Sequence, residues 1–232
     1  MSASRGTAIL ALLLLVPAAS LGVASAMIFF PGTWLGPVIF GAAKAWLFGL
    51  PLAWRLLVER QPISLSPPRH GGFAVAAMSG LAISLVIWAA YLVAGARLID
   101  RGFFVDKLTA VGLGSPAAYA GGAAYWILVN SVLEECVWRW FCVRQCEQLL
   151  PRGPAVILSG LFFTVHHVVA LRVYMGPIPT LLCSLGIFTG GAIWSWMYTR
   201  YRSIWPGYVS HAIVDLCVFG LGAWLLFGPA AP

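Results

Sequence analysis

Long apolar runs, separated by short polar or Pro- and Gly-rich breaks, make up most of this 232-residue chain. The runs cover residues 6–30, 34–58, 73–96, 120–143, 154–174, 177–199 and 203–227. Each is near or above the ~20 residues that an α-helix needs to cross a bilayer. Several breaks hold clusters of Pro and Gly, such as PRGP and MGPIP, which end helices. The pattern predicts an all-α, polytopic membrane helical bundle of about seven transmembrane helices, in a single membrane domain spanning 1–232.

The composition agrees with this pattern. Of all residues, 61% are hydrophobic and only 9% are charged, and the mean hydropathy is +0.90. A soluble domain carries roughly 25% charged residues, so this chain has too little charge to cover a soluble globule. The net charge of +7 comes from basic residues near helix ends, which indicates membrane topology rather than nucleic-acid binding.

Arginine and lysine are distributed unevenly between the predicted loops. With the N-terminus inside, the inner loops hold Arg5, Arg55, Arg60, Arg69, Arg144, Arg152, Arg200 and Arg202, and the outer loops hold Arg97, Arg101, Lys107 and Arg172. This asymmetry favours a cytoplasmic N-terminus if the number of spans is odd. The first run has ASA at 24–26, yet it is longer than a usual signal-peptide core. We therefore expect it to remain as the first span rather than to be cleaved.

The longest polar connection, residues 96–119, mixes apolar and charged side chains. Leu98, Phe103 and Leu108 are interleaved with charged residues such as Asp106 and Lys107. This composition suits either an interfacial helix at the lipid headgroups or a solvated loop.

Three ionisable side chains interrupt the apolar run 120–143, in the sequence LEECVWRWF at 133–141. A charge inside the bilayer costs at least ~2.5 kcal/mol on insertion scales, so such residues are candidates for a functional site. Residues four apart share a helical face, which pairs Glu135 with Arg139. Successive residues are about 100° apart, so Glu134 points elsewhere and needs a partner from another helix.

Two further predicted spans also carry ionisable side chains. One contains His166 and His167, and the other contains His211 and Asp215, which lie four apart on one helical face. A carboxylate with histidines suits a general base on water with oxyanion donors, a metal site, or a proton relay in a transporter. No HExxH sequence is present, and adjacent histidines are not expected to point at one ion from a single helix. A metal site would therefore need ligands from all three helices.

Three short motifs in this half of the chain resemble those of the CPBP family, the CAAX proteases and bacteriocin-processing enzymes. EECVWR fits the family's Glu-Glu-x-x-x-Arg motif, FTVHH fits Phe-x-x-x-His, and HAIVD fits His-x-x-x-Asn/Asp. The stretch WSWMYTRYRSIWPGYVSH at 194–211 also resembles the family's approach to its last motif. The resemblance covers a catalytic core at about 120–220, whereas the N-terminal spans within 6–96 carry no motif.

The resemblance implies a glutamic-type intramembrane endopeptidase that uses no metal or other cofactor. Under this implication Glu134 is the general base on water, and Glu135 with Arg139 forms its supporting ion pair. His211 and Asp215 form the oxyanion site. The family often has Asn at the last position, and an ionised Asp215 could not donate a hydrogen bond. Asp215 is therefore either protonated or acts by orienting His211.

The second motif fits the chain in two registers. Either Phe162 leads to His166, or Phe163 leads to His167. We favour Phe163 and His167, because the Leu-x-Phe pattern before the histidine then resembles the family better. His167 would share the catalytic water with the general base, and His166 is its alternative.

The resemblance implies a class of substrate but no single substrate. We expect a membrane-anchored or lipidated protein or peptide tail, cleaved within the lipid bilayer, and no nucleic-acid partner. The compact chain favours a prokaryotic inner (plasma) membrane enzyme. The alternatives are a proton-coupled transporter, a membrane scaffold such as a bacteriocin immunity protein, and, within enzymes, a metal-dependent protease. A transporter is disfavoured because the chain has no internal repeat and its polar residues gather in one half.

Overall fold

The computed structural model describes residues 5–64 and 66–229, and the regular structure of these ranges is entirely helical. Six helices are long and apolar enough to cross a membrane: Arg5–Phe29, Leu35–Val58, Phe73–Leu98, Arg152–Tyr174, Pro177–Tyr201 and Ile204–Phe227. Their bounds lie within two residues of six of the predicted apolar runs. Hydrophobic length alone was therefore enough to locate them.

Three of these helices change from α-helical to π-helical geometry along their length. α1 (Arg5–Ala24) continues into the π-helix η1 (Ser25–Phe29), α2 (Leu35–Ala53) into η2 (Trp54–Val58), and α3 (Phe73–Ala90) into η3 (Tyr91–Gly95) and α4 (Ala96–Leu98). The other three are single α-helices, α9 (Arg152–Tyr174), α10 (Pro177–Tyr201) and α11 (Ile204–Phe227). α10 starts at Pro177 because proline is tolerated in the first helical turn, and it ends where Arg202 turns to a positive φ.

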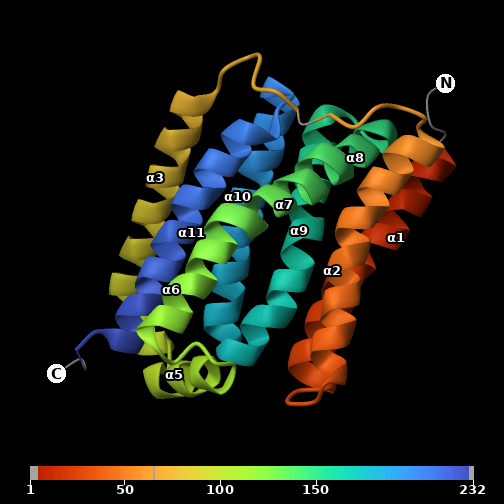
Figure 1. The fold of residues 1–232 in the computed structure, drawn as a ribbon. Helices are drawn as coiled ribbons and strands as arrows, with labels where there is room; N and C mark the ends of the chain where they lie inside the picture. The colour runs from red at the N-terminus through yellow and green to blue at the C-terminus, as the bar shows by residue number, and fades with distance from the viewer. Residues whose placement is uncertain (1–4, 65, 230–232) are drawn as a thin grey trace.

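The remaining predicted span, 120–143, lies inside one continuous helical segment, 116–149. The segment consists of α6 (Pro116–Tyr125), η4 (Trp126–Asn130), α7 (Ser131–Glu135), η5 (Cys136–Val143) and α8 (Arg144–Leu149). It is not among the six apolar helices, because polar and charged side chains dilute its hydropathy. Figure 1 nevertheless shows it running between the same two ends of the bundle as its neighbours.

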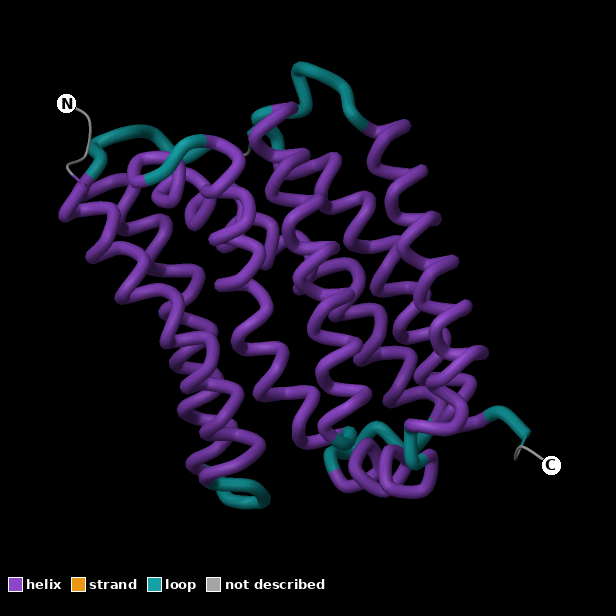
Figure 2. Tube along the Cα trace, turned by 180° about the vertical axis from the view of Figure 1, so that it is seen from behind, coloured by secondary structure: helices purple, strands orange, loops and turns teal. Residues whose placement is uncertain are grey.

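The segment 116–149 crosses the bundle obliquely (Figure 1). Its α6 end packs against α11 and its α8 end packs against α1. α1 pairs with α2, α3 packs along α11, and α9 packs along α10. Seen from behind, the helices run side by side, with loops at the two ends of the bundle (Figure 2). This crossing places α7, with the two glutamates, in the middle of the molecule.

The two described ends of the chain lie at opposite ends of the bundle (Figure 1). Arg5 Nη2 donates to the carbonyl of Leu149 at 3.5 Å, at the end of α8. At the other end, Arg101 donates to the carbonyls of Leu225 and Pro229 at 2.7 and 2.6 Å and so caps α11. An odd number of crossings produces this arrangement, as the predicted topology requires.

The connection 96–119 contains a helix, α5 (Arg101–Ala110). This favours the expected interfacial helix over a solvated loop. α5 begins where the Asp100 side chain accepts a hydrogen bond from Phe103 N at 3.0 Å. α6 begins in the same way at Ser115, whose Oγ accepts from Ala118 N at 3.3 Å, and has Pro116 in its first position. That α5 lies at the depth of the lipid headgroups remains a prediction.

Ion pairs tie the loops to the helices at the Arg5 end of the bundle. Glu59 accepts from Arg55 Nη1 at 2.6 Å and from Gln145 Nε2 at 2.9 Å. Arg202, in the turn between α10 and α11, donates to both oxygens of Glu147 at 2.6 and 2.9 Å. This bidentate contact raises the pKa of the Arg202 guanidinium.

Candidate active site

The two glutamates of the EECVWR motif lie at the end of a short α-helical stretch between two π-helical ones. α7 is preceded by η4 and followed by η5. π-helical turns are rare and occur frequently at functional sites, and their hydrogen bonds run from i to i+5. Side chains four apart therefore align less directly across this junction than in a regular α-helix.

Glu135 and Arg139 form the predicted contact, and both side chains are completely buried. Arg139 Nε lies 3.5 Å from Glu135 Oε1. The described residues provide no hydrogen-bond partner for any of the three guanidinium nitrogens of Arg139. The Arg139 Cζ atom instead lies 4.5 Å from the ring centroid of Phe163 and 5.3 Å from that of Trp194. A carboxylate and two aromatic rings thus hold the arginine, and a desolvated cation–π contact is worth about 2 kcal/mol.

The imidazole of His211 lies between the two glutamates. Its Nδ1 is 3.1 Å from Glu135 Oε1, and its Nε2 is 3.9 Å from Glu134 Oε2 and 3.6 Å from Asp215 Oδ2. Ionised carboxylates only accept hydrogen bonds, so Nδ1 is placed to donate to Glu135, while Nε2 faces the other two carboxylates at longer distance. The expected alignment of His211 with Asp215 on one helical face is confirmed. Glu134 has His211 as a partner from another helix, as expected, but Asn130 of its own segment also hydrogen-bonds it, which was not expected.

Neighbouring side chains fix the position of His211 and Asp215. The Trp194 ring stacks on His211 with centroids 4.0 Å apart and an interplanar angle of 15°. Trp194 Nε1 donates to Ser210 Oγ at 3.0 Å. Ser131 Oγ lies within hydrogen-bond distance of both Asp215 Oδ2, at 2.6 Å, and the Trp126 carbonyl, at 2.9 Å, and so holds Asp215 in place.

Gly207 allows α11 to approach the buried ion pair closely. A Cβ atom built on Gly207 would overlap Glu135 Oε2. The glycine thus provides the space in which the Glu135 carboxylate reaches His211. The sequence offered no signal that this position had to be glycine.

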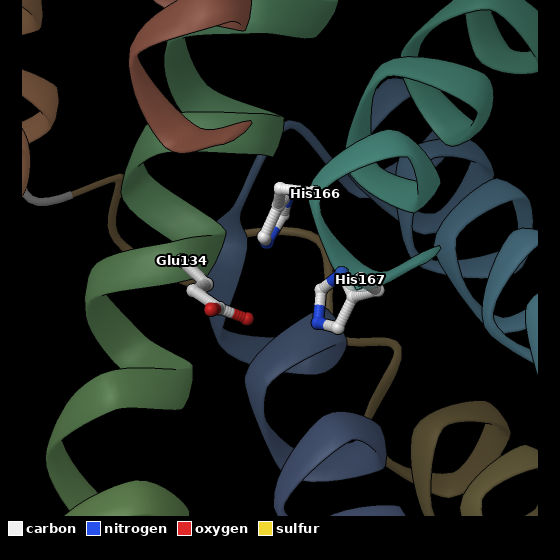
Figure 3. A group of neighbouring side chains, drawn as sticks. All are labelled: Glu134, His166 and His167. Atoms are coloured by element: carbon white, nitrogen blue, oxygen red, sulfur yellow. The ribbon is translucent and has the colours of Figure 1, made fainter. Parts of the chain in front are cut away.

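His166 and His167 both point toward Glu134, as Figure 3 shows. One ring nitrogen of each histidine and one Glu134 oxygen lie within 4.8 Å of one another. The two imidazole centroids are 4.0 Å apart. The expectation that adjacent histidines cannot face the same point is wrong for this site. The ~100° separation applies at the backbone, and rotation about the side-chain bonds moves the rings together.

The same three side chains match the donor set of a catalytic zinc site, His, His and Glu. His167 Nδ1 donates to the Phe163 carbonyl at 2.8 Å, which leaves its Nε2 free to accept a proton or bind a cation. By donor type and spacing the residues fit one divalent ion. Such a site takes its ligands from α7 and α9, so the expectation that all three helices must contribute is also wrong.

Lys44, which lies within α2, was not among the predicted site residues. Its Nζ donates to Asn130 Oδ1 at 2.8 Å, and the Asn130 side chain hydrogen-bonds Glu134. A lysine inside an apolar run is a functional-site candidate by the rule that singled out the glutamates. The ionisable groups around Glu134 therefore come from both halves of the chain.

A protein-family model described as "Type II CAAX prenyl endopeptidase Rce1-like" matches residues 116–217. The matched segment contains all three motifs and the helices α7, α9 and α11 that carry them. No curated protein and no solved structure matches the chain. The match confirms the resemblance to the CAAX proteases and favours a protease over a transporter. Over residues 116–217 the chain is similar to the Rce1-like type II CAAX prenyl endopeptidases, a similarity that supports a CAAX-type intramembrane protease at the family level.

Proposed function

We propose that this protein hydrolyses a peptide bond in a membrane-anchored or lipidated tail, using water activated by Glu134. The observation that carries the proposal is the convergence of Glu134 with His167 from α9 and His211 from α11. All three lie inside the family-matched segment. A proton relay would need groups spread along the transport path, whereas these groups form one cluster.

In the proposed reaction the Glu134 carboxylate accepts a proton from water, and the resulting hydroxide attacks the scissile carbonyl carbon. The carbonyl π electrons move to oxygen, and the oxyanion accepts a hydrogen bond from His211 Nε2. When the tetrahedral intermediate collapses, the C–N bond breaks and the leaving nitrogen takes the proton held by Glu134. Asp215 Oδ2 lies 3.6 Å from His211 Nε2 on the same helix, which supports a role in orienting His211.

His167 is the better candidate for the histidine that shares the water. Because its Nδ1 donates to the Phe163 carbonyl, its Nε2 carries the lone pair that can accept from water. The His166 ring instead stacks on Trp138, with centroids 5.3 Å apart and an interplanar angle of 7°. We therefore assign the water contact to His167 and a packing role to His166.

A metal-dependent protease is the second candidate, because Glu134, His166 and His167 fit a divalent ion. When bound, the ion would polarise the scissile carbonyl or lower the pKa of a bound water. Two cations already interact with Glu134, since Lys44 and Arg139 both act on it electrostatically. Their repulsion of a divalent ion favours the metal-free reaction.

Chelation should leave the activity unchanged. We expect the purified protein to contain less than stoichiometric zinc and to cleave its substrate equally well with and without EDTA. The measurement is elemental analysis combined with a cleavage assay before and after chelation. Stoichiometric zinc, with activity lost on chelation and restored by zinc, would establish the metal-dependent candidate.

The substrate class follows from where the site lies. Glu134 is part of a helix within the bundle, so the scissile bond must reach the bilayer region, as a membrane-anchored or lipidated tail can. We place the protein in a prokaryotic inner membrane with a cytoplasmic N-terminus. The basic end of the bundle, which holds Arg5, then faces the cytoplasm.

Deleting the gene should leave at least one membrane protein with an uncleaved tail. Mass spectrometry of C-terminal peptides from wild-type and deletion strains measures this directly. Wild-type protein supplied in trans should restore cleavage, and the Glu134→Gln variant should not. If the two strains show identical C-terminal peptides, the proposed protease function is wrong.

A further inference from the structure

We propose that Lys44 is a positioning residue for the general base. Through Asn130 it holds the Glu134 carboxylate in its reacting orientation. The inference rests on the proposed function, in which Glu134 activates water. It extends the active site to α2, which lies outside the family-matched segment 116–217.

The place of Lys44 in its helix is unusual. In the six apolar helices, the other basic residues lie within a few residues of a helix end, where a long side chain can reach the interface. Lys44 lies nine residues after Leu35 and fourteen before Val58. An ammonium at this depth is costly unless it has a partner. Such a residue therefore calls for a specific interaction.

The partner of Lys44 is the buried side chain of Asn130. The distance from Lys44 Nζ to Asn130 Oδ1 is 2.8 Å, and Asn130 is 3% exposed. An ammonium only donates, so the amide oxygen of Asn130 must face Lys44. The NH₂ group then faces the other way and donates to Glu134, four residues further along the segment. Lys44 thus fixes which end of the amide meets the carboxylate.

The positive charge of Lys44 lies near the other glutamate of the motif, just as Arg139 lies near Glu135. Glu135 has Arg139 as its contacting cation, at 3.5 Å. Lys44 acts electrostatically on Glu134 from the side of α2. Lys44 therefore adds to the two-glutamate motif a second cation, which comes from a different helix than Arg139.

Phe40 and Phe48 help to keep the ammonium in place. Their ring centroids lie 5.7 and 5.9 Å from Lys44 Nζ, one turn before and one turn after it on the same helix. Contacts of this kind stabilise a cation. Lys44 is therefore held at a defined point beside Asn130.

The Lys44→Met variant should lower kcat roughly 10- to 100-fold with little change in KM, the range typical of groups that support a reacting residue without touching substrate. Lys107→Met is the matched control, because Lys44 and Lys107 are the only lysines of the chain and Lys107 lies in α5. The control should keep the wild-type kcat. Steady-state cleavage of one tail peptide by the purified full-length variants measures both constants.

Two further variants separate positioning from a purely structural role. Lys44→Arg keeps the charge and the donor, so it should restore most of kcat, whereas Lys44→Gln keeps only a donor and should not. If Lys44 acts through Asn130, the double variant Lys44→Met/Asn130→Ala should be no slower than the slower single variant. Independent effects would multiply instead. If Lys44→Met does not fold, the comparison of Lys44→Arg with Lys44→Gln decides the question.

The outcomes distinguish this inference from the proposed function. Full kcat in Lys44→Met or in Lys44→Gln, with Glu134→Gln inactive, would overturn the role of Lys44 and leave the general base intact. Multiplicative losses in the double variant would also overturn it. Normal cleavage by Glu134→Gln would overturn both, because Lys44 would then have no base to position.

Discussion

Glu134→Gln should lower peptide-bond cleavage by roughly 10²–10⁴-fold, the usual contribution of a general base. Glutamine keeps the size of the side chain and can still accept from Asn130, but it cannot take a proton from water. The Glu134 side chain is 12% exposed and its carboxylate lies 3.9 Å from His211 Nε2, so little packing depends on its charge. The measurement is cleavage of a tail peptide together with the melting temperature of the purified variant.

Glu147→Gln is the matched control for this substitution. Glu147 lies on the same helical segment but contacts Arg202 at the end of the bundle, so the control should cleave normally. Glu135→Gln should have an intermediate effect, because Arg139 and His211 keep a neutral acceptor. If Glu135→Gln is inactive and stable while Glu134→Gln cleaves normally, the roles of the two glutamates are reversed. Normal cleavage by both variants would contradict a glutamic-type mechanism.

Arg139→Ala should destabilise the protein by about 3–5 kcal/mol, the usual cost of removing one partner of a buried ion pair. Its side chain is fully buried against the Glu135 carboxylate and the rings of Phe163 and Trp194. Its removal leaves Glu135 with His211 alone and opens a cavity between two helices. The expected result is a lower melting temperature in detergent, less protein in the membrane, and loss of cleavage.

Arg144→Ala provides the comparison. Arg144 lies five residues further along, is 31% exposed, and contacts Glu59 at 3.4 Å. Because exposed pairs contribute ~0–1 kcal/mol, this variant should melt close to wild type. If Arg139→Ala also melts like wild type, the buried pair does not hold the site together, and its role in our account is wrong.

The helical membrane fold could be predicted from the sequence because the length of an apolar run is a local property. Six of the runs became helices with ends within two residues of the predicted ones. The rule that ionisable residues inside spans are functional-site candidates singled out Glu134, Glu135, Arg139 and His211 without any coordinates, and the structure brings these four together. Spacing by four also found the contacts of Glu135 with Arg139 and of His211 with Asp215, since both pairs lie within one continuous helical segment.

Contacts between helices that are distant in the chain could not be predicted from the sequence. Whether adjacent histidines converge depends on side-chain rotations, and His166 and His167 both reach Glu134 although helical geometry argued against it. The aromatic rings around Arg139 and the place of His211 between the glutamates depend on how α9, α10 and α11 pack.

Lys44 illustrates what the sequence shows and what it does not. Its presence inside an apolar run was visible in the sequence. Its partner Asn130 lies 86 residues further along the chain, at a point that only the oblique crossing of the segment 116–149 brings beside α2. The sequence alone therefore determined which residues would be costly in a membrane, because that cost belongs to each residue and its own span. Only the tertiary structure decided which of them meet, because each contact requires two helices to approach at one particular depth and angle.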